Sequence, residues 1–239
     1  MIVTYAATRN LYPYMLPSIV SLMEHNEVET IYLLIEDDAL PYPTPKQCKC
    51  INVSGQTIFP KDGVNYRNRF TYMVLMRTAY TRILPVGKVL QLDVDTIITD
   101  SLEELWNTDL EGKWFAAVNE DKGSFRPYGP EYYNFGVVLF NLDQIKKDGI
   151  EDKLIYNLNN KHYQFLDQDA WNEQKDGKVV RLPSRFNECF ATNYSDDPAI
   201  VHYAGYPDWM TNGTMPRVSY LEKYKHLYMT GKTSPPVCV

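Results

Sequence analysis

The chain has 239 residues, of which 44% are hydrophobic and 23% are charged, with a net charge of −6 and a pI near 5.3. This length and composition suit one large soluble domain, and the acidic balance argues against nucleic-acid binding, which needs a basic surface. The start of the chain lacks the basic residues and the apolar run of a signal peptide, and no segment approaches the ~20 apolar residues of a membrane span. The four cysteines show neither CxxC nor zinc spacing, so we expect reduced thiols and a cytoplasmic location.

In chain order, short apolar runs that predict strands alternate with segments of helical spacing. The predicted strands are residues 2–7, 31–35, 50–53, 89–92, 115–118, 135–142, 179–182 and 199–203, and the predicted helices are residues 13–25, 70–84, 142–159 and 167–174. Alternation of strands and helices in the N-terminal part implies right-handed βαβ units. We therefore expect an α/β fold with a mostly parallel central sheet flanked by helices, and ligands bound beyond the carboxyl ends of its strands.

Two carboxylates interrupt the apolar run VLQLDVDTIITDS, in which Asp93 and Asp95 follow a predicted buried strand. Because an unpartnered buried carboxylate is costly and two of them repel each other, a divalent cation between them is the obvious candidate partner. Three interpretations remain open from these residues: a solvated turn, a phosphotransferase of the haloacid-dehalogenase type, and a metal-dependent glycosyltransferase. The dehalogenase motif resembles Asp-x-Asp-Gly-Thr after the first strand, whereas this run lacks the glycine and lies past residue 90.

Further sequence blocks favour the third interpretation. Together with VLQLDVD they are AATRN (residues 6–10), TAYTRIL (78–84), DSLEELWNTDL (100–110), YYNFGVVLFNL (132–142), FLDQDAWN (165–172), SRFNECFATNY (184–194) and HYAG (202–205). In this order they resemble glycosyltransferase family 8, a retaining group that includes bacterial lipopolysaccharide galactosyltransferases and glycogenin. The resemblance covers roughly residues 1–210.

The resemblance implies a single domain of the GT-A fold, with a UDP-sugar in a cleft over the sheet. Asp93, Asp95 and His202 match the metal ligands, and their oxygen and imidazole character suits Mn²⁺, with Mg²⁺ as the alternative. Asn134, Asp167 and Gln168 match residues at the reacting face, where Gln168 would stabilise positive charge during same-face attack. The positions that match donor-binding residues are Ala6, Thr8, Asn10, Arg82, Asp93, Val94, Asp95, Glu120 and Gly205.

Several of these positions also have a purely structural explanation. His202 fits a packed core histidine, and Asn134 before Phe135-Gly136 fits a turn cap. Asp167 fits a helix N-cap, and Arg82 fits a partner for a carboxylate on the helix surface. From each residue alone these explanations stay open.

One segment departs from the family pattern. Relatives carry a lysine after the HxxG block that neutralises the diphosphate, but here Tyr206-Pro207-Asp208 follows HYAG. We therefore predict slower transfer than in lysine-bearing relatives, with Arg9 or Arg82 as the compensating charge. A non-catalytic nucleotide-sugar-binding protein of the same fold is the alternative.

The sequence thus predicts a retaining, Mn²⁺-dependent transferase that moves glucose or galactose from UDP-glucose or UDP-galactose. The acceptor, whether a glycan, a lipid-linked molecule or a protein, is not indicated by any residue pattern. We expect a glycosyltransferase domain over residues 1–215 and a helical tail over residues 216–239. The tail carries three lysines, which at ~1 kcal/mol each support at most weak peripheral contact with an anionic membrane.

Overall fold

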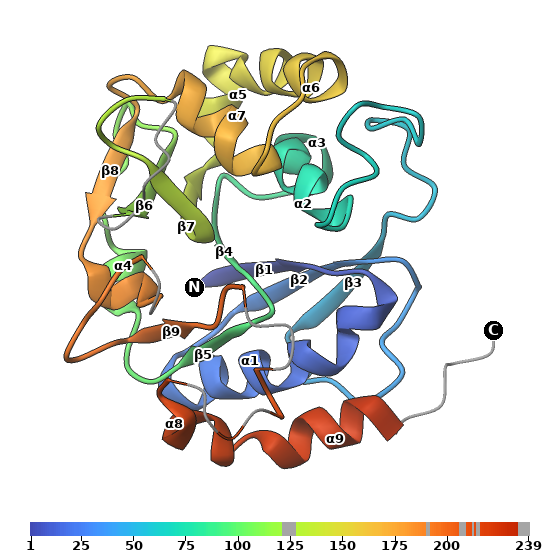
Figure 1. Cartoon of the computed structure of the whole chain (residues 1–239), viewed down its shortest axis with the longest axis vertical. Helices are drawn as coiled ribbons and strands as arrows, with labels where there is room; N and C mark the ends of the chain where they lie inside the picture. The colour runs from blue at the N-terminus through green and yellow to red at the C-terminus, as the bar shows by residue number, and fades with distance from the viewer. Residues whose placement is uncertain (121–127, 190–191, 206–208, 212, 214–215, 234–239) are drawn as a thin grey trace.

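A seven-stranded mixed sheet forms the centre of the molecule (Figure 1). The computed structural model describes residues 1–120, 128–189, 192–205, 209–211, 213 and 216–233. The strand order is β3-β2-β1-β4-β7-β6-β8, with parallel β1–β2, β1–β4, β2–β3 and β6–β8 pairs and antiparallel β4–β7 and β6–β7 pairs. The predicted α/β class with a mostly parallel sheet is therefore confirmed. The strands are β1 (Ile2–Ala6), β2 (Thr30–Ile35), β3 (Cys48–Asn52), β4 (Lys88–Leu92), β6 (Phe115–Asn119), β7 (Tyr133–Asn141) and β8 (Val179–Leu182).

Each face of the sheet is covered by its own hydrophobic core. Alternate residues of β2 enter different cores, with Ile31, Leu33 and Ile35 in one and Tyr32 and Leu34 in the other. Burial on both faces explains why β2 is apolar throughout instead of alternating with polar residues. Helix α1 (Tyr12–His25) packs on the first face, and the second face carries α2 (Met73–Met76), α3 (Tyr80–Ile83), α5 (Leu142–Asp148), α6 (Ile150–Asn160) and α7 (Leu166–Gln174).

Two predicted helices are divided in the structure. Residues 70–84 form α2, a short 3₁₀ segment (Arg77–Ala79) and α3, so helical structure begins only at Met73 and tightens at Arg77. Residues 142–159 form α5 and α6 because Gly149 adopts a left-handed conformation, with φ of 65°, between them. A glycine tolerates that conformation without the steric cost that other residues pay, so it ends the first helix.

A second, two-stranded ribbon joins the middle of the chain to its C-terminal part. It pairs β5 (Thr96–Ile98) antiparallel with β9 (Ile200–His202). Ile97 and Val201 of this ribbon share a small core with Leu221 and Tyr224. The C-terminal helices α8 (Val218–Glu222) and α9 (Lys225–Thr233) lie on the same side as α1, and α9 contacts α1 (Figure 1). The proposed boundary between residues 215 and 216 stays a prediction.

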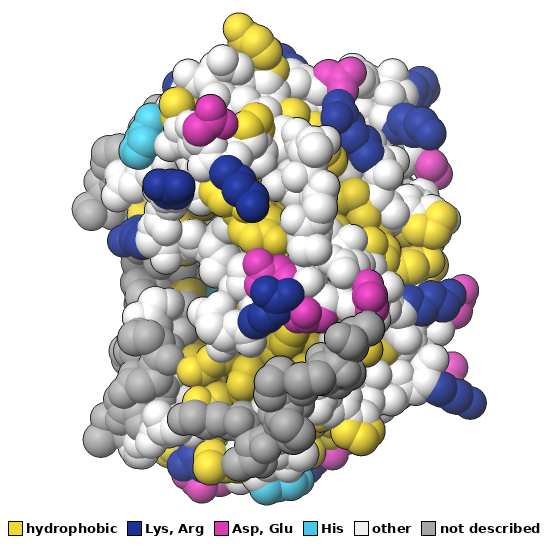
Figure 2. Space-filling model, turned by 90° about the vertical axis from the view of Figure 1, so that its right-hand side faces the viewer, with side chains coloured by type: hydrophobic (Ala, Val, Ile, Leu, Met, Phe, Trp, Pro, Cys, Tyr) yellow, Lys and Arg dark blue, Asp and Glu magenta, His cyan; other side chains and the backbone are white. Residues whose placement is uncertain are grey.

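The surface carries charges of both signs. On the face drawn in Figure 2, basic and acidic side chains are interspersed among the described residues. In the C-terminal part, Lys223 pairs with Glu24 at 2.6 Å and Lys225 pairs with Glu222. Within the described part of the chain, no helix has both the length and the apolar character that crossing a bilayer requires. The expected lack of nucleic-acid binding and of strong membrane contact remain predictions.

Candidate metal and donor site

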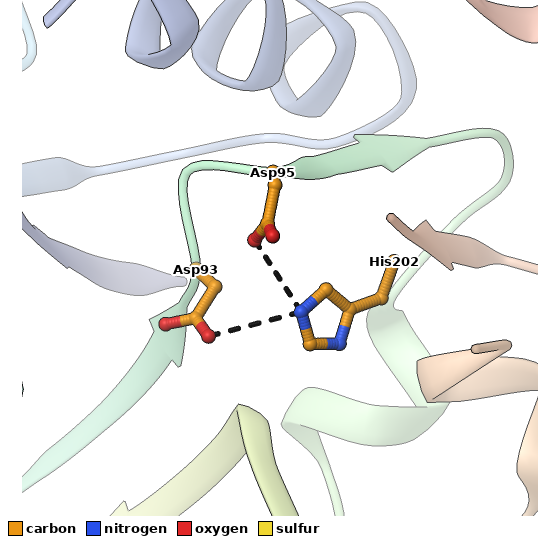
Figure 3. A group of neighbouring side chains, drawn as sticks. All are labelled: Asp93, Asp95 and His202. Atoms are coloured by element: carbon orange, nitrogen blue, oxygen red, sulfur yellow. Dashed lines mark ion pairs between the residues drawn. The ribbon is translucent and has the colours of Figure 1, made fainter. Parts of the chain in front are cut away.

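The two aspartates of the DVD run lie in the turn between β4 and β5, not within a strand. Three backbone-directed hydrogen bonds shape this turn: Thr96 Oγ1 donates to the carbonyl of Asp93 at 2.8 Å, Asp93 N to Gly136 O at 2.8 Å, and Tyr203 N to Asp95 O at 2.9 Å. The turn is thereby tied to β7 and to the residue after β9. Figure 3 shows both carboxylates directed toward the same imidazole.

His202 approaches from β9, where it stands opposite Thr96 in the ribbon. Its Nε2 lies 3.3 Å from Asp95 Oδ1 and 3.7 Å from Asp93 Oδ2 (Figure 3). The ring packs closely against Gly136, since a Cβ at that position would lie 2.0 Å from the imidazole Cε1. A glycine in the middle of β7 is thus required by the close approach of His202.

These three side chains fit a divalent cation. One ligand atom from each lies within 4.8 Å of the others, and two ligands of one octahedral ion at ~2.1 Å lie about 3 Å apart. Two carboxylate oxygens with one imidazole suit Mn²⁺ better than Ca²⁺ or Mg²⁺, which favour oxygen ligands alone. The geometry agrees with the predicted set Asp93, Asp95 and His202, while the ion's identity stays a prediction.

The charges of this cluster interact strongly because the buried His202 ring lies 3.3 Å from Asp95 and 3.7 Å from Asp93, both of which are partly buried. Burial lowers the pKa of His202, but the carboxylates of Asp95 and Asp93 outweigh it and raise that pKa to about 9. Burial also opposes ionisation of Asp95, yet the imidazole outweighs it and lowers the pKa of Asp95. For Asp93 burial is the larger effect and raises its pKa. The cluster therefore holds an imidazole in contact with at least one ionised carboxylate.

Arg77 is the cation that the structure brings to this cluster. Its side chain is only 7% exposed, and Nε and Nη2 donate to the two oxygens of Asp167 at 2.9 and 3.0 Å. Nη1 donates to Asp93 and, at 3.2 Å, to the carbonyl of Phe135. Burial raises the pKa of Asp167 to about 6, with the guanidinium opposing the rise. Arg77 thus links the metal-binding turn to Asp167 on α7.

The arginines proposed from sequence lie elsewhere. Arg82 is 44% exposed and pairs with Glu151 at 3.2 Å and with Asp152, both on α6. The structural explanation of Arg82, a partner for a carboxylate, describes these contacts, one with the buried Glu151 and one with the exposed Asp152. Arg9 forms a two-pronged pair with Asp37 and also donates from Nη2 to the carbonyl of Glu36 at 3.1 Å. Arg77, not Arg82, is the arginine that contacts Asp93 and Asp167. The roles proposed for Arg82 as a donor contact, and for Arg9 or Arg82 as the compensating charge, stay predictions.

The residues expected at the reacting face form one hydrogen-bonded group. Asn134 Nδ2 donates to Glu120 Oε1 at 2.8 Å, and Gln168 Nε2 approaches the same oxygen at 3.3 Å. Gln168 Oε1 accepts from the backbone N–H of Phe135 at 2.9 Å. The structure therefore brings Asn134, Gln168 and Glu120 together, as the sequence predicted, although it does not test their roles.

The first predicted donor loop follows β1. Ala6 is the last residue of β1, and Thr8 Oγ1 donates to Asn10 Oδ1 at 2.6 Å. Because β1, β2 and β4 are parallel neighbours, this loop and the metal-binding turn lie at the same edge of the sheet. Val94 lies between the two aspartates and is 8% exposed, and Gly205 is exposed with φ of 83°. Asp208 and its loop lie outside the described residues.

Two contributors to the site were missed from sequence. Arg77 had a signal, because it is the single charge in an apolar helical stretch from Met73 to Tyr80. Asn187 is fully buried and bonds to the Nδ1 of His202 at 2.9 Å. Its polar side chain directly after Phe186 gave only a weak signal, because asparagine is common in turns.

Comparison with known proteins shows the family of this chain. The glycosyl transferase family 8 profile matches residues 2–209. Glycosyltransferase GlyA of Streptococcus pneumoniae is 32% identical over 149 residues, which are 58% of this chain and 21% of that protein. The chain spans only 21% to 42% of the length of the first curated relatives.

Two solved structures share the fold. A crystal structure of LgtC superposes with a TM-score of 0.72 and 22% identity, covering 99% of this chain and 98% of the other. GlyE of Streptococcus pneumoniae superposes with a TM-score of 0.71 and 21% identity, covering 98% of this chain and 65% of the other. The haloacid-dehalogenase interpretation is wrong, because the fold matches glycosyltransferases and the aspartates follow β4. With the profile match over most of its length, the chain belongs to glycosyl transferase family 8.

Proposed function

We propose that this glycosyltransferase transfers a hexose, glucose or galactose, from a UDP-sugar with retention at the anomeric carbon and with Mn²⁺ at Asp93, Asp95 and His202. The observation that carries the proposal is the convergence of these three side chains at the carboxyl edge of the sheet, beside Arg77. A galactosyltransferase of the same fold, LgtC, has been crystallised with donor and acceptor sugar analogues. That complex supports a sugar donor for this chain as well.

The metal would be held by Asp93, Asp95 and His202, with Mg²⁺ as the alternative ion. When bound, a divalent cation supplies positive charge against the diphosphate leaving group. Arg77 pairs with both Asp93 and Asp167 and orients the two carboxylates through fixed hydrogen bonds. A planar guanidinium is suited to this because its donors match carboxylate geometry.

The other residues predicted at the site fall into two groups, one that would contact the nucleotide and one that would contact the sugar. Ala6, Thr8 and Asn10 would contact the nucleotide at the end of β1, with Val94 and Gly205 lining the diphosphate path. Asn134, Asp167 and Glu120 would contact the transferred sugar.

Gln168 is the candidate for stabilising positive charge at the anomeric carbon. Its carbonyl oxygen accepts one hydrogen bond from Phe135 N, and an amide oxygen has a second lone pair available. An amide is a poor nucleophile, so we favour attack by the acceptor on the face from which the leaving group departs. The released hexose should then keep the donor's anomeric configuration.

The test is a screen of UDP-glucose and UDP-galactose with Mn²⁺, scoring released UDP, with NMR of the freshly released sugar. Asp95→Asn should abolish Mn²⁺-dependent UDP binding in calorimetry and remove turnover. Asp109→Asn is the matched control, because Asp109 is exposed and lies near Lys88 at the opposite end of β4. Equal UDP affinity with and without Mn²⁺ in wild type and Asp95→Asn would refute the metal assignment.

Nucleotide choice separates this function from its alternatives. Stabilisation against heating by UDP with Mn²⁺ should exceed that by GDP or ADP, because only differential binding shifts the melting temperature. UDP-sugar binding without any turnover would instead identify a non-catalytic nucleotide-sugar-binding protein. Asp208→Lys is then the informative variant, since it restores the cation that relatives carry.

A further inference from the structure

The second nitrogen of the His202 ring is held by a chain of buried amides. While Nε2 faces the two aspartates, Nδ1 lies 2.9 Å from Asn187 Oδ1. Asn187 is fully buried and His202 is 4% exposed, so water is excluded from this contact. A buried polar contact of this kind fixes the ring only if its donor and acceptor roles are defined.

The orientation of Asn134 defines those roles. The backbone N–H of Gly136 can only donate, and it points at Asn134 Oδ1 from 2.9 Å. On the other side, the Glu120 carboxylate accepts from Asn134 Nδ2 at 2.8 Å. Two independent groups thus assign the same oxygen and nitrogen to the Asn134 amide.

The assignment carries through to the histidine. Asn134 Oδ1 also lies 2.8 Å from Asn187, so the facing atom of Asn187 must be its donor, Nδ2. The remaining Asn187 atom is then Oδ1, which can only accept. Its partner, His202 Nδ1, must therefore carry a hydrogen, and Nε2 is the nitrogen that is left to bind a metal.

We propose that Asn187 is a positioning residue that, through Asn134 and Glu120, holds His202 with Nδ1 protonated and Nε2 directed at the cation. The inference rests on the proposed metal site. It connects two parts of that site, because Glu120 also contacts Gln168 at the reacting face. Metal-bound histidines are commonly oriented by a hydrogen bond from their other nitrogen, and loss of such a partner typically weakens metal binding 10–100-fold.

The first experiment measures Mn²⁺ affinity by calorimetry without any sugar nucleotide. Asn187→Leu removes the acceptor while keeping the same branched side-chain shape, and it should weaken Mn²⁺ binding about 10–100-fold. Asn187→Asp keeps an acceptor for Nδ1–H but loses the donor to Asn134 Oδ1, so it should bind Mn²⁺ more weakly than wild type and more tightly than Asn187→Leu. Asn65→Leu is the matched control: Asn65 is 1% exposed, and it bonds to the carbonyls of Leu158 and Lys161 and to the N–H of Tyr163. That control should lose stability while keeping its Mn²⁺ affinity.

The second experiment keeps Asn187 unchanged, so it does not depend on whether an Asn187 variant folds. Protein with isotope-labelled histidine is loaded with Zn²⁺, which is diamagnetic and accepts the same donor set, and the ring-nitrogen NMR signals are recorded. His202→Gln assigns the signals of His202 among the four histidines. The expected result is a protonated Nδ1 and a metal-bound Nε2.

The outcomes separate the two proposals. If wild type binds no Mn²⁺, the metal site proposed above is wrong and this inference falls with it. If wild type binds Mn²⁺ and Asn187→Leu binds it as tightly as Asn65→Leu does, the inference alone is wrong. Metal on Nδ1 in the NMR spectrum would also overturn it.

Discussion

Two arginine–carboxylate groups stand at the carboxyl edge of the same sheet, and they differ mainly in burial. Arg77 is 7% exposed and its partner Asp167 is 1% exposed. Arg9 is 64% exposed and its partner Asp37 is 37% exposed. Both arginines approach their carboxylates with two nitrogens, so the hydrogen-bond chemistry is nearly the same.

The two groups differ in how well water can solvate each carboxylate once its arginine has been removed. An exposed carboxylate is solvated by water and loses little. A buried carboxyl group is poorly solvated when charged, so removing its partner leaves either an unsolvated charge or a group forced to take up a proton, and both are costly. We therefore expect that removing Arg77 lowers both the free energy of unfolding and ligand binding. Removing Arg9 should affect ligand binding alone.

The largest effect is expected for Arg77→Met. Breaking a buried ion pair leaves Asp167 and Asp93 uncompensated and should cost about 3–5 kcal/mol of unfolding free energy. Urea denaturation monitored by circular dichroism measures this loss. Arg77→Met/Asp167→Asn should recover part of it, because the most buried charge is then removed as well. Wild-type stability in Arg77→Met would show that burial of the ion pair does not make it more important than the exposed Arg9 pair.

Two glycines allow the same comparison of a buried and an exposed neighbour, here for a steric clash instead of a charge. A Cβ on Gly136 would lie 2.0 Å from the ring of His202, and a Cβ on Gly87 would lie 2.1 Å from Asp143 Oδ2. The His202 ring is buried and fixed, whereas Asp143 is exposed and can rotate away. Gly136→Ala should therefore cost about 1–3 kcal/mol and weaken Mn²⁺ binding, and Gly87→Ala should cost about 0.5 kcal/mol or less.

Urea denaturation and Mn²⁺ calorimetry on the two variants give the answer. Equal losses of stability would mean that His202 can move as freely as a surface side chain. Preserved Mn²⁺ affinity in Gly136→Ala would mean that the ring position is not critical for the ion.

An intermediate case is the pair between Arg217 and Glu188. Glu188 is 1% exposed, Arg217 is 25% exposed, and Nε lies 3.7 Å from Oε1. Burial raises the pKa of Glu188, and Arg217 opposes that rise. Because only one partner is buried and the contact is long, Arg217→Met should cost about 1–2 kcal/mol, measured by urea denaturation.

Arg217 also bears on the domain division, because it lies beyond residue 215. Glu188 N–H donates to Ile200 O, and His202 N–H donates to Glu188 O, so the backbone of Glu188 lies beside β9, the strand that carries His202. Glu188→Gln in the Arg217→Met background should restore most of the stability. Failure of that rescue would show that Arg217 acts by another contact, such as its bond to the carbonyl of Ser195 at 2.5 Å.

Sequence-based prediction was most informative for residues that follow an apolar run and that neighbouring strands bring to the same edge of the sheet. Asp93 and Asp95 directly follow an apolar strand, and parallel neighbouring strands bring their carboxyl ends together. The division of residues 70–84 was not predicted, because helical spacing is unchanged across Arg77 and only its buried contacts mark the position. Arg82 and Arg77 lie on one predicted helical segment, and only tertiary packing decides which of them is buried. The donor contact proposed for Arg82 stays a prediction. Asn187 depends on a partner 15 residues away in sequence and had no local pattern to reveal it.

The smallest effect is expected for Arg9→Met. Its pair with Asp37 is exposed to solvent and screened by salt, and holding two long side chains in place costs entropy. The Arg9 backbone N–H bonds to Glu36 Oε2 at 3.0 Å and would remain after the substitution. The melting temperature at physiological salt should therefore stay at the wild-type value, and Asp37→Asn should behave alike. UDP affinity in the presence of Mn²⁺, measured by calorimetry, should fall only a few-fold, because the loop keeps its backbone contacts. A melting temperature lowered as far as in Arg77→Met would show that burial is not what separates the two arginine groups.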